Sequence, residues 1–429
     1  MVGLVVDKVI TYLGLLLSRP RVVFYYFYFI GQMKLDLDCL LGKQNERLGR
    51  YLVDVPYLNY VRGGDVRQYI SDVEVVDKRK MKEFPGRYNN SGIAKRKWKN
   101  VQTGGSTGVP FKYRLEKKCE DVGMALLFRG WSYGGYSLGD RVAVLAGGSL
   151  VGKKVGFKGR LTQRILNMKK FSSYGVSDED LFGYYQSMKG WQAEFLRGYV
   201  SSVYEFAKYI NRNSLSLRFK AVFTTAEMLG EKERKYIEST FSCKVFNNYG
   251  LNDGGISAYE CEHGSLHVDL ERALLEVVDD DGCPIVGEVG RIVATAYNNR
   301  ATYFVRYDTG DLGVLSSKKC SCGRPYPILD GLKGRSTDAI FINGKMIGSP
   351  VLTVLMSHTS VKRYQFHCYS EQVILIVEAD KYAFESEDLP LIKKSLFSHV
   401  GSFDLRVSYD LSGLEKTSSG KHKVVVNHV

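Results

Sequence analysis

A strand–helix–strand pattern in the middle of the chain limits the fold more than any other feature of the sequence. Residues 220–225 form a short apolar run that ends in two threonines, residues 231–241 are charged with a helical pattern, and residues 244–246 are apolar again. This spacing predicts parallel strands with helices on the faces of the sheet. We therefore expect the α/β fold class, with a large domain built on parallel and mixed sheets.

The pattern changes to β-structure with short turns over residues 266–315. Strands are predicted at 273–278 and 291–296. Between them, residues 279–282 read Asp-Asp-Asp-Gly, which we interpret as a solvated turn rather than a cation site. The later part of the large domain is therefore expected to be a β-rich subdomain.

The composition changes again beyond residue 334. A strongly apolar strand is predicted at 373–377, a helix at 389–400 and a strand at 405–409. These elements fit a small α+β unit of about a hundred residues. We expect a large domain at residues 1–333 and a small, mobile C-terminal lid domain at 334–429.

The formal net charge of +14 in 429 residues favours anionic partners. Nucleic acid, an anionic membrane face and phosphorylated ligands such as ATP or coenzyme A are the candidates. A basic run at residues 95–99 could guide such anions, although most runs of this kind are solvated faces. No known nucleic-acid-binding module is present, so we expect no nucleic-acid partner. A zinc-containing nucleic-acid-binding protein remains a remote alternative.

The first 40 residues are rich in apolar side chains but do not predict a membrane-spanning helix. The apolar pieces 4–17 and 22–30 are each shorter than the ~20 residues that cross a bilayer. No small-residue cleavage site follows them, so a secretory signal is not expected. A packed helical lead is favoured, and contact with the inner membrane face, supported by the aromatic run 24–29, is the alternative. The expected location is the cytoplasm, with or without peripheral membrane contact.

The eight cysteines are scattered and favour a reducing compartment over a disulfide framework. Cys261 lies close in sequence to His263 and His267, and Cys320 and Cys322 form a tight pair. Thiolate and imidazole are the preferred ligands of tetrahedral zinc. We predict a structural zinc held by Cys261, His267, Cys320 and Cys322, with His263 as a substitute for His267. Buried free thiols with surface histidines are the alternative.

A glycine- and hydroxyl-rich loop has the composition of a phosphate-binding site. Glycine lets backbone N–H groups face an anion, and short hydroxyl side chains add donors. An ordinary surface turn is the alternative, because the same residue types dominate turns. The candidate residues are Thr103, Gly104, Gly105, Ser106, Thr107 and Gly108.

Polar residues follow both strands of the central pattern. Ala226 and Glu227 come after the first strand, and Asn248, Tyr249 and Gly250 come at the end of the second. Ligands of parallel sheets bind beyond the carboxyl ends of the strands. We therefore expect these five residues to lie on the same rim of the sheet.

The order of the motifs along the chain carries a family resemblance. After the glycine loop and Tyr249-Gly250 come residues 306–311 (RYDTGD), residues 334–338 (GRSTD) and a late Gly420-Lys421 pair. This series resembles the acyl-adenylate-forming superfamily. It is most similar to the branch of phenylacetate–CoA ligases and coenzyme F390 synthetases that includes proteins of capsule biosynthesis. The segment 44–57, which ends in Val-Pro-Tyr, and the turn 196–199 also resemble that branch.

The resemblance covers about residues 40–425 and implies a two-step reaction. A carboxylate attacks the α-phosphate of ATP, and an acyl-adenylate forms as pyrophosphate leaves. A nucleophile then takes the acyl group: CoA in the first hypothesis, or an amine such as an amino sugar or amino acid in the second. ATP, Mg²⁺ and CoA are the implied cofactors, and capsule or exopolysaccharide biosynthesis is an implied setting.

The resemblance also implies a role for each motif. The loop Thr103–Gly108 would hold the β- and γ-phosphates, and Asp311 would accept the ribose hydroxyls. Arg335 would reach the ribose or a phosphate, and Lys421 would approach the α-phosphate and the substrate carboxylate. Asp253 would bind Mg²⁺ where relatives carry a glutamate. Lys421, Asp253 and Arg335 are thus the candidate catalytic residues.

The residues on the rim of the sheet would border the adenine and substrate pocket. They are Ala226, Glu227, Asn248, Tyr249 and Gly250. Glu227 also has a structural explanation as a carboxylate at the start of a helix.

Three positions depart from the pattern of the family. Phe111 stands directly after the proline of the glycine loop, where many relatives have lysine, and Lys112 follows it. Asp253 is one methylene shorter than glutamate. Thr337 occupies a place that is often acidic, near the hinge of the small domain. These departures concern the geometry of the metal site and the hinge rather than the fold.

Overall fold

A computed structural model provides the structure of the chain. The residues that it describes are 2–102, 111–146, 157–172, 177–332, 334–335, 339–342, 345–348, 352, 355–356, 359–369, 372–415 and 423–428. Every structural statement below refers to these residues. The loop Thr103–Gly108, Thr337 and Lys421 lie outside them.

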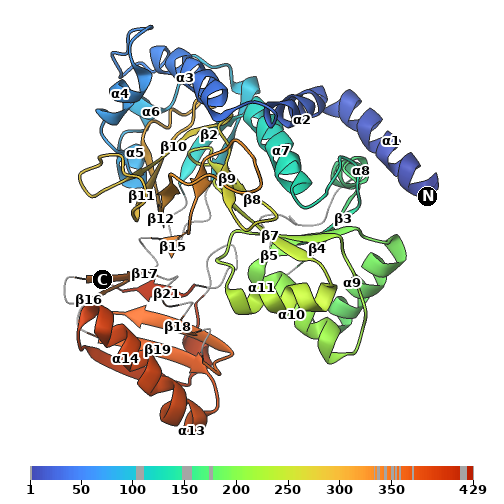
Figure 1. Cartoon of the computed structure of the whole chain (residues 1–429), viewed down its shortest axis with the longest axis vertical. Helices are drawn as coiled ribbons and strands as arrows, with labels where there is room; N and C mark the ends of the chain where they lie inside the picture. Colours follow the sequence, from blue (N-terminus) through green and yellow to red (C-terminus); the bar gives the residue numbers. More distant parts are fainter. Residues whose placement is uncertain are drawn as a thin grey trace.

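A nine-stranded mixed sheet forms the centre of the molecule (Figure 1). Its strand order is β13-β14-β9-β8-β7-β6-β5-β3-β4, and the neighbours from β7 to β4 are parallel. Antiparallel pairs join β7, β8, β9, β14 and β13 at the other side. The bounds are β3 Val142–Ala146, β4 Met168–Ser172, β5 Phe195–Tyr199, β6 Ala221–Thr225, β7 Lys244–Gly250, β8 Ser257–Glu260, β9 Leu266–Val268, β13 Leu315–Ser316 and β14 Ile328–Leu329.

Helices cover both faces of the parallel strands, as the alternation of apolar side chains requires. Val142 and Val144 of β3 face one hydrophobic cluster, and Ala143 and Leu145 face the other. The first cluster is closed by α2 (Pro20–Gln32) and α7 (Lys117–Ser132), and the second by α9 (Asp178–Trp191), α10 (Val200–Arg212) and α11 (Glu231–Phe241). The predicted α/β class is confirmed.

A β-rich part lies beside this sheet, as the sequence predicts. Its four-stranded antiparallel sheet has the order β10-β11-β12-β15, and a hairpin of β1 and β2 packs nearby. The bounds are β1 Trp98–Gln102, β2 Lys112–Glu116, β10 Leu274–Val278, β11 Gly290–Thr295, β12 Tyr307–Gly313 and β15 Gly334–Arg335. One long helix, α3 Leu37–Val53, and several short ones surround it: α4 Val66–Ser71, α5 Lys78–Glu83, α6 Pro85–Tyr88 and η1 Lys95–Lys97.

The C-terminal elements surround a hydrophobic cluster of their own, drawn from residues between 340 and 425. They lie at the lower end of the molecule in Figure 1. The division at residues 333 and 334 stays a prediction: this cluster supports it, although β15 still pairs with β12. The bounds are β16 Ala339–Ile342, β17 Lys345–Gly348, β18 Arg363–Cys368, β19 Gln372–Glu378, α13 Lys381–Ala383, η3 Phe384–Asp388, α14 Leu389–Val400, β20 Asp404–Ser408, η4 Leu411–Gly413 and β21 Val425–Asn427.

Two helices begin the chain, α1 (Val2–Ser18) and α2, and α1 also contacts α8 (Phe157–Ile165). Leu15, Val22 and Phe29 are buried against α7 and the sheet, which agrees with a packed helical lead. Among the described residues, no helix is both long and apolar enough to cross a membrane.

Candidate active site and Cys/His cluster

The carboxyl ends of β6 and β7 bring the predicted rim residues together. The two strands are parallel, and Thr225 is paired with Asn248. Ala226 therefore follows β6 directly beside Asn248 and Tyr249. Its φ of +68° lies in the left-handed region, which is strained for a residue with a Cβ and is common at functional sites.

Strand β12 packs its side chains against the end of β7. The Tyr249 hydroxyl donates a hydrogen bond to Asp311 Oδ2 at 2.9 Å, and the Tyr307 hydroxyl donates to Asp253 Oδ2 at 3.1 Å. The structure thus joins two predicted ribose and adenine residues directly and places the predicted magnesium residue beside them.

Arg335 reaches the same place through its backbone. Strand β15 pairs with β12 so that Arg335 is the partner of Asp311. Of the candidate nucleotide residues, Ala226, Asn248, Tyr249, Asp311 and Arg335 are therefore at one edge. The phosphate-loop candidates and Lys421 lie outside the described residues, so their roles stay predictions.

Asp253 occupies a buried position between tyrosines. Its side chain is 8% exposed, and two left-handed glycines, Gly254 and Gly255, follow it. Burial raises the pKa of Tyr307, and the negative charge of Asp253 raises it further. Tyr307 therefore stays protonated and donates to Oδ2 of Asp253, so Oδ1 is the atom that suits a Mg²⁺ ion.

The second cluster of candidate ligands is also brought together. One ligand atom from each of Cys261, His267, Cys320 and Cys322 lies within 4.8 Å of the others. The Sγ atoms of Cys261 and Cys320 are 3.7 Å apart, and His267 Nε2 is 3.2 Å from Cys322 Sγ. The set matches the thiolate and imidazole ligands of tetrahedral zinc.

His267, and not its proposed substitute His263, belongs to this cluster. His263 is exposed, and its Nδ1 is hydrogen-bonded to Ser321 Oγ at 3.1 Å. His267 is 1% exposed, and its Nδ1 meets the Tyr326 carbonyl at 3.2 Å. Because a carbonyl only accepts, Nδ1 carries the proton and Nε2 keeps its lone pair for a metal.

The thiols are oriented in a similar way. The backbone N–H of His263 points at Cys261 Sγ at 3.4 Å, and that of Cys322 points at Cys320 Sγ at 3.5 Å. Burial is the main cause that raises the pKa of Cys261, to about 12. Burial also lowers the pKa of His267, which keeps the imidazole neutral. Metal binding at this cluster must therefore release the Cys261 proton.

A buried cluster of charged side chains lies next to the Cys/His cluster. Arg129 is fully buried and binds Asp269, Glu271 and the Tyr326 hydroxyl. Tyr326 thus connects this ion cluster to His267 through its own carbonyl. The sequence analysis missed both residues, because a lone arginine and a lone tyrosine so far apart in sequence carry no signal.

Comparison with family models gives no match, whereas curated proteins do match. "Protein CapK" of Staphylococcus aureus is 29% identical over 155 residues, 36% of this chain and 33% of CapK. The phenylacetate-coenzyme A ligase of Thermus thermophilus is 35% identical over 147 residues, 33% of each protein. The chain thus aligns with about a third of the length of these curated homologues.

Solved structures resemble the chain over a larger part. A 2-hydroxyisobutyryl-CoA ligase in complex with an acyl-AMP has a TM-score of 0.67 at 17% identity, and the match covers 91% of this chain and 89% of the ligase. The amide bond synthetase McbA of Marinactinospora thermotolerans has a TM-score of 0.52 at 14% identity, covering 78% and 70%. The chain has the fold of the acyl-adenylate-forming superfamily.

In this adenylate-forming fold, Glu227 has a structural partner. Its carboxylate accepts hydrogen bonds from the Ser201 N–H at 2.7 Å and the Ser201 hydroxyl at 2.9 Å. It therefore serves the first turn of α10, where unpaired N–H groups favour a carboxylate. Ser201 is the donor in both hydrogen bonds, and the helix itself begins at Val200.

Phe111, which stands where the resemblance leads us to expect lysine, is part of the hydrophobic interior. Its side chain is 3% exposed and lies against the rings of Tyr113, Phe304 and Tyr307. Lys112 is exposed at the start of β2. The ring of Phe111 thus packs against Tyr307, the partner of Asp253.

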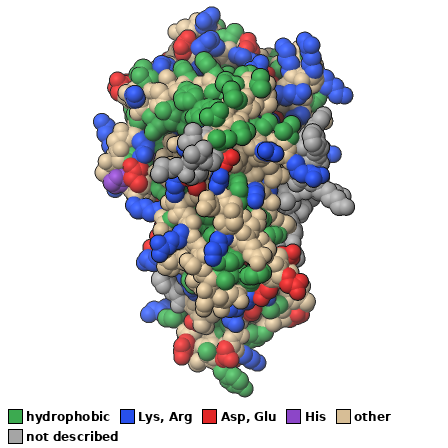
Figure 2. Space-filling model, turned by 90° about the vertical axis from the view of Figure 1, so that its right-hand side faces the viewer, with side chains coloured by type: hydrophobic (Ala, Val, Ile, Leu, Met, Phe, Trp, Pro, Cys, Tyr) green, Lys and Arg blue, Asp and Glu red, His purple; other side chains and the backbone are tan. Residues whose placement is uncertain are grey.

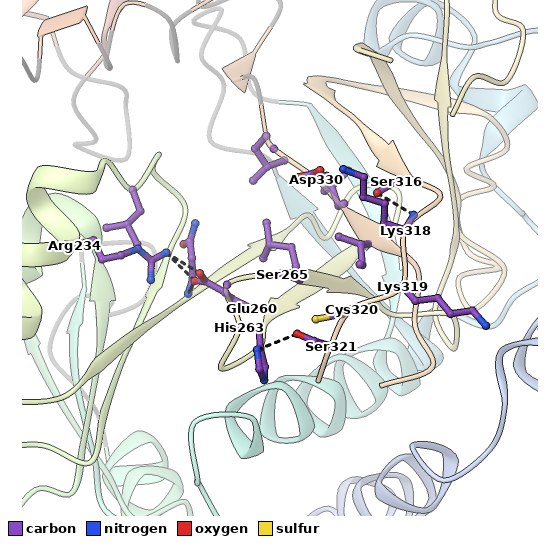
Figure 3. Close-up of a pocket in the computed structure, with 18 of the residues that line it drawn as sticks. Arg234, Glu260, His263, Ser265, Ser316, Lys318, Lys319, Cys320, Ser321 and Asp330 are labelled. Atoms are coloured by element: carbon purple, nitrogen blue, oxygen red, sulfur yellow. Dashed lines mark hydrogen bonds and ion pairs between the residues drawn. The ribbon is translucent and has the colours of Figure 1, made fainter. Parts of the chain in front are cut away.

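A cavity of about 540 Å³ lies between the β6–β7 rim and the Cys/His cluster (Figure 3). Arg234 and Glu260 form an ion pair of 2.8 Å on one side, and Lys318 and Lys319 lie on another. Asn247 lines this cavity, but the candidate nucleotide residues do not. The cavity is therefore a separate site next to the proposed nucleotide edge.

Proposed function

We propose that this chain activates a carboxylic acid with ATP, forming an acyl-adenylate and pyrophosphate, and then transfers the acyl group to CoA. The observation that carries the proposal is the hydrogen bond between Tyr249 and Asp311 at the ends of β7 and β12. It sets a buried carboxylate beside the rim at which parallel sheets bind ligands. The shared fold and the partial homology with a phenylacetate-coenzyme A ligase support it.

In the proposed chemistry, the protein must bring two anions together, the substrate carboxylate and the phosphates of ATP, and stabilise the charge that develops. Asp311 accepts the two ribose hydroxyls, and the Tyr249 hydroxyl keeps its carboxylate oriented. Asp253 would hold Mg²⁺, and the ion would neutralise phosphate charge. Lys421 supplies a cation where the substrate carboxylate meets the α-phosphate, and this lowers the repulsion between the two anions.

A second acceptor is supported by a specific observation. The amide bond synthetase McbA shares the fold, so transfer to an amine is the alternative to transfer to CoA. The alignment with CapK supports a role in capsule or exopolysaccharide biosynthesis, in which an amino sugar could be the acceptor.

ATP–pyrophosphate exchange across a panel of aromatic, aliphatic and amino acids tests the first step. We expect exchange with at least one acid, and the thioester with CoA or the amide with an amino sugar is then identified by mass. Asp311→Asn should lower the exchange, whereas Asp330→Asn, in the neighbouring cavity, should not. Absence of exchange with every acid would refute adenylation.

We also propose that the Cys/His cluster binds a structural zinc ion. The four ligand atoms and the oriented Nδ1–H of His267 fit a closed tetrahedral site, which would supply cross-linking rather than reactivity. Metal analysis of the purified full chain should show close to one equivalent of zinc. Far less than one equivalent would refute this assignment.

We propose that the N-terminal helices contact the inner membrane face. The exposed apolar residues of α1 repeat every three or four positions and therefore form one stripe. Phe24 and Phe27 of α2 are also exposed. Figure 2 views the side on which α1 lies and shows hydrophobic side chains gathered on its upper part. The residues of the α1 stripe are Val6, Val9, Ile10, Leu13, Leu16 and Leu17.

Basic residues beside the stripe favour lipid over another protein as its occupant. Arg160 and Arg164 are exposed on α8, which approaches α1 so closely that a Cβ at Gly14 would lie 3.0 Å from Ile165. Arg21 is exposed at the start of α2. An apolar stripe with cations at its border fits an anionic bilayer surface.

Sedimentation with anionic and neutral vesicles tests this contact. We expect binding to anionic vesicles that is lost in Leu13→Asp/Leu17→Asp and retained in Leu391→Asp, which changes an equally exposed leucine of α14. Equal sedimentation of all variants would refute it. A dimer in solution that the double substitution disperses, without vesicle binding, would assign the stripe to a second copy of the chain.

A further inference from the structure

Two histidines of the C-terminal part lie side by side outside the sites described above. His367 is on β18, and His428 follows β21, which pairs in parallel with β18. His367 Nδ1 and His428 Nε2 are 2.9 Å apart. The ring of Tyr369 stacks on His428 with centroids 4.5 Å apart, so the second imidazole has a fixed plane as well.

Gln365 determines which nitrogen of His367 carries the proton. The Gln365 amide donates to two backbone carbonyls, those of Glu415 at 2.8 Å and Lys423 at 2.9 Å. Its Oε1 must therefore be an acceptor, and it meets His367 Nε2 at 2.9 Å. Nε2 consequently bears the proton, and the lone pair of Nδ1 points toward His428.

A carboxylate completes the group. Glu415 offers an oxygen atom within 4.8 Å of the two imidazole nitrogens. Its position is fixed, because its N–H donates to Gln365 Oε1 at 2.7 Å and its carboxylate meets Lys423 Nζ at 2.7 Å. The buried Gln365 thus orients His367 and holds the backbone of Glu415, while Lys423 holds the Glu415 carboxylate.

We propose that His367, Glu415 and His428 form a second metal site, which binds a divalent transition metal of the zinc class. Two imidazoles and one carboxylate are ligands that zinc, nickel and copper accept, and the three leave a position open for water. Imidazole nitrogens on one tetrahedral zinc stand about 3.3 Å apart, given Zn–N bonds of about 2.0–2.1 Å. The observed 2.9 Å requires only a small movement.

The site also has a consequence for the reaction, which rests on the proposed function. Glu415 and Lys423 flank residues 416–422, the segment that contains Lys421. Gln365 already binds the backbone of both flanking residues. A metal bound to His367, Glu415 and His428 therefore adds a bond at Glu415, the described residue that precedes this segment in sequence, and we expect it to change the rate of the half-reaction that uses Lys421.

Zinc analysis of the full chain after equilibrium dialysis against Zn²⁺ tests the site. We expect the wild-type chain to hold one more equivalent than His428→Ala and Glu415→Gln. Cys322→Ser should keep this equivalent while it loses the other. Glu387→Gln, an exposed carboxylate on η3, is the matched control and should bind as the wild type does. Because His428 is exposed, its substitution should leave the fold intact.

Equal zinc content in the wild type, His428→Ala and Glu415→Gln would overturn the metal site. The kinetic consequence is measured separately, as a change of about twofold or more in pyrophosphate exchange when the second equivalent is bound, since a ligand changes a rate only by its differential binding. An unchanged rate with the second zinc bound refutes the effect on Lys421 alone. Zinc binding without exchange for any acid refutes the proposed function and leaves the metal site standing.

Discussion

The nucleotide edge and the Cys/His cluster lie in one molecule but are built in different ways. At the Cys/His cluster, backbone groups orient the ligands: the Tyr326 carbonyl fixes His267, and two backbone N–H groups meet sulfur atoms. At the nucleotide edge, side chains are paired with each other, as Tyr249 is with Asp311 and Tyr307 with Asp253.

The difference fits the two proposals, a resident ion at the Cys/His cluster and a passing substrate at the proposed nucleotide edge. Backbone groups cannot move away without a change in the fold of the turns that hold them, so they suit a closed structural centre. Side-chain pairs can exchange one partner for a ligand, so they suit a site that fills and empties in every turnover. Four predictions test this contrast, in order of decreasing effect.

Loss of the zinc ligand set should have the largest effect and should act on stability. Structural zinc contributes on the order of 10 kcal/mol of binding free energy, so Cys322→Ser or chelation should lower the Tm by roughly 10 °C or more. Acid should release the metal, because the Cys261 thiol and the His267 imidazole regain protons. Differential scanning calorimetry measures the change.

Cys283→Ser is the matched control for that experiment, because Cys283 is exposed and lies outside the cluster. Its Tm should equal that of the wild type. A Tm that chelation leaves unchanged would contradict the closed structural centre and would weaken the contrast between the two regions.

Lys421→Ala should act on rate and leave stability unchanged. Removal of one preorganised positive group at a developing charge costs about 10²–10³ in rate, so pyrophosphate exchange should fall by that factor. The Tm should not move. Lys394→Ala, an exposed lysine of α14, controls for the loss of a surface charge, and a wild-type exchange rate in Lys421→Ala would contradict its role.

Asp311→Asn should have a moderate effect at the nucleotide edge. The ribose loses a charged acceptor, which is worth about 1.5–3 kcal/mol, so kcat/KM for ATP should fall by roughly tenfold or more. Tyr249→Phe should lower kcat/KM for ATP by a smaller factor, because the Tyr249 hydroxyl only orients Asp311. Steady-state kinetics measure kcat/KM for ATP in both variants. A larger decrease of kcat/KM in Tyr249→Phe than in Asp311→Asn would reverse the two roles.

Glu227→Gln should have the smallest effect. Its carboxylate stabilises the first turn of α10, a contribution of about 0.3–1 kcal/mol, and this is the expected loss in urea denaturation. The KM for ATP should not change. A tenfold increase in KM with unchanged stability would instead make Glu227 a ligand of the nucleotide and would move it from the helix to the active site.

Much of the fold could be predicted from local patterns. The helix predicted at residues 231–241 is α11, and the strand predicted at 220–225 agrees with β6 within one residue. The shared rim also followed from sequence, because parallel strands expose their carboxyl ends at one edge. Each of these features depends on the spacing of residues that are close together in the chain, so the sequence alone can predict it.

Other features could not be predicted, because they join residues that are far apart in sequence. Arg129 meets Asp269 and Glu271 across about 140 positions, and no local pattern announces such a pair. The burial of Phe111 under Tyr307 and the group of His367, Glu415 and His428 have the same origin.

The sequence by itself determined the α/β pattern, the order of the motifs and the three cysteines and two histidines offered as zinc ligands, since each depends on spacing along the chain. Only the tertiary structure decided that His267 rather than His263 joins the cysteines, that Glu227 serves α10, and that Tyr249 holds Asp311. The physical reason is that a hydrogen bond depends on distance and direction in space, which packing sets and sequence separation does not.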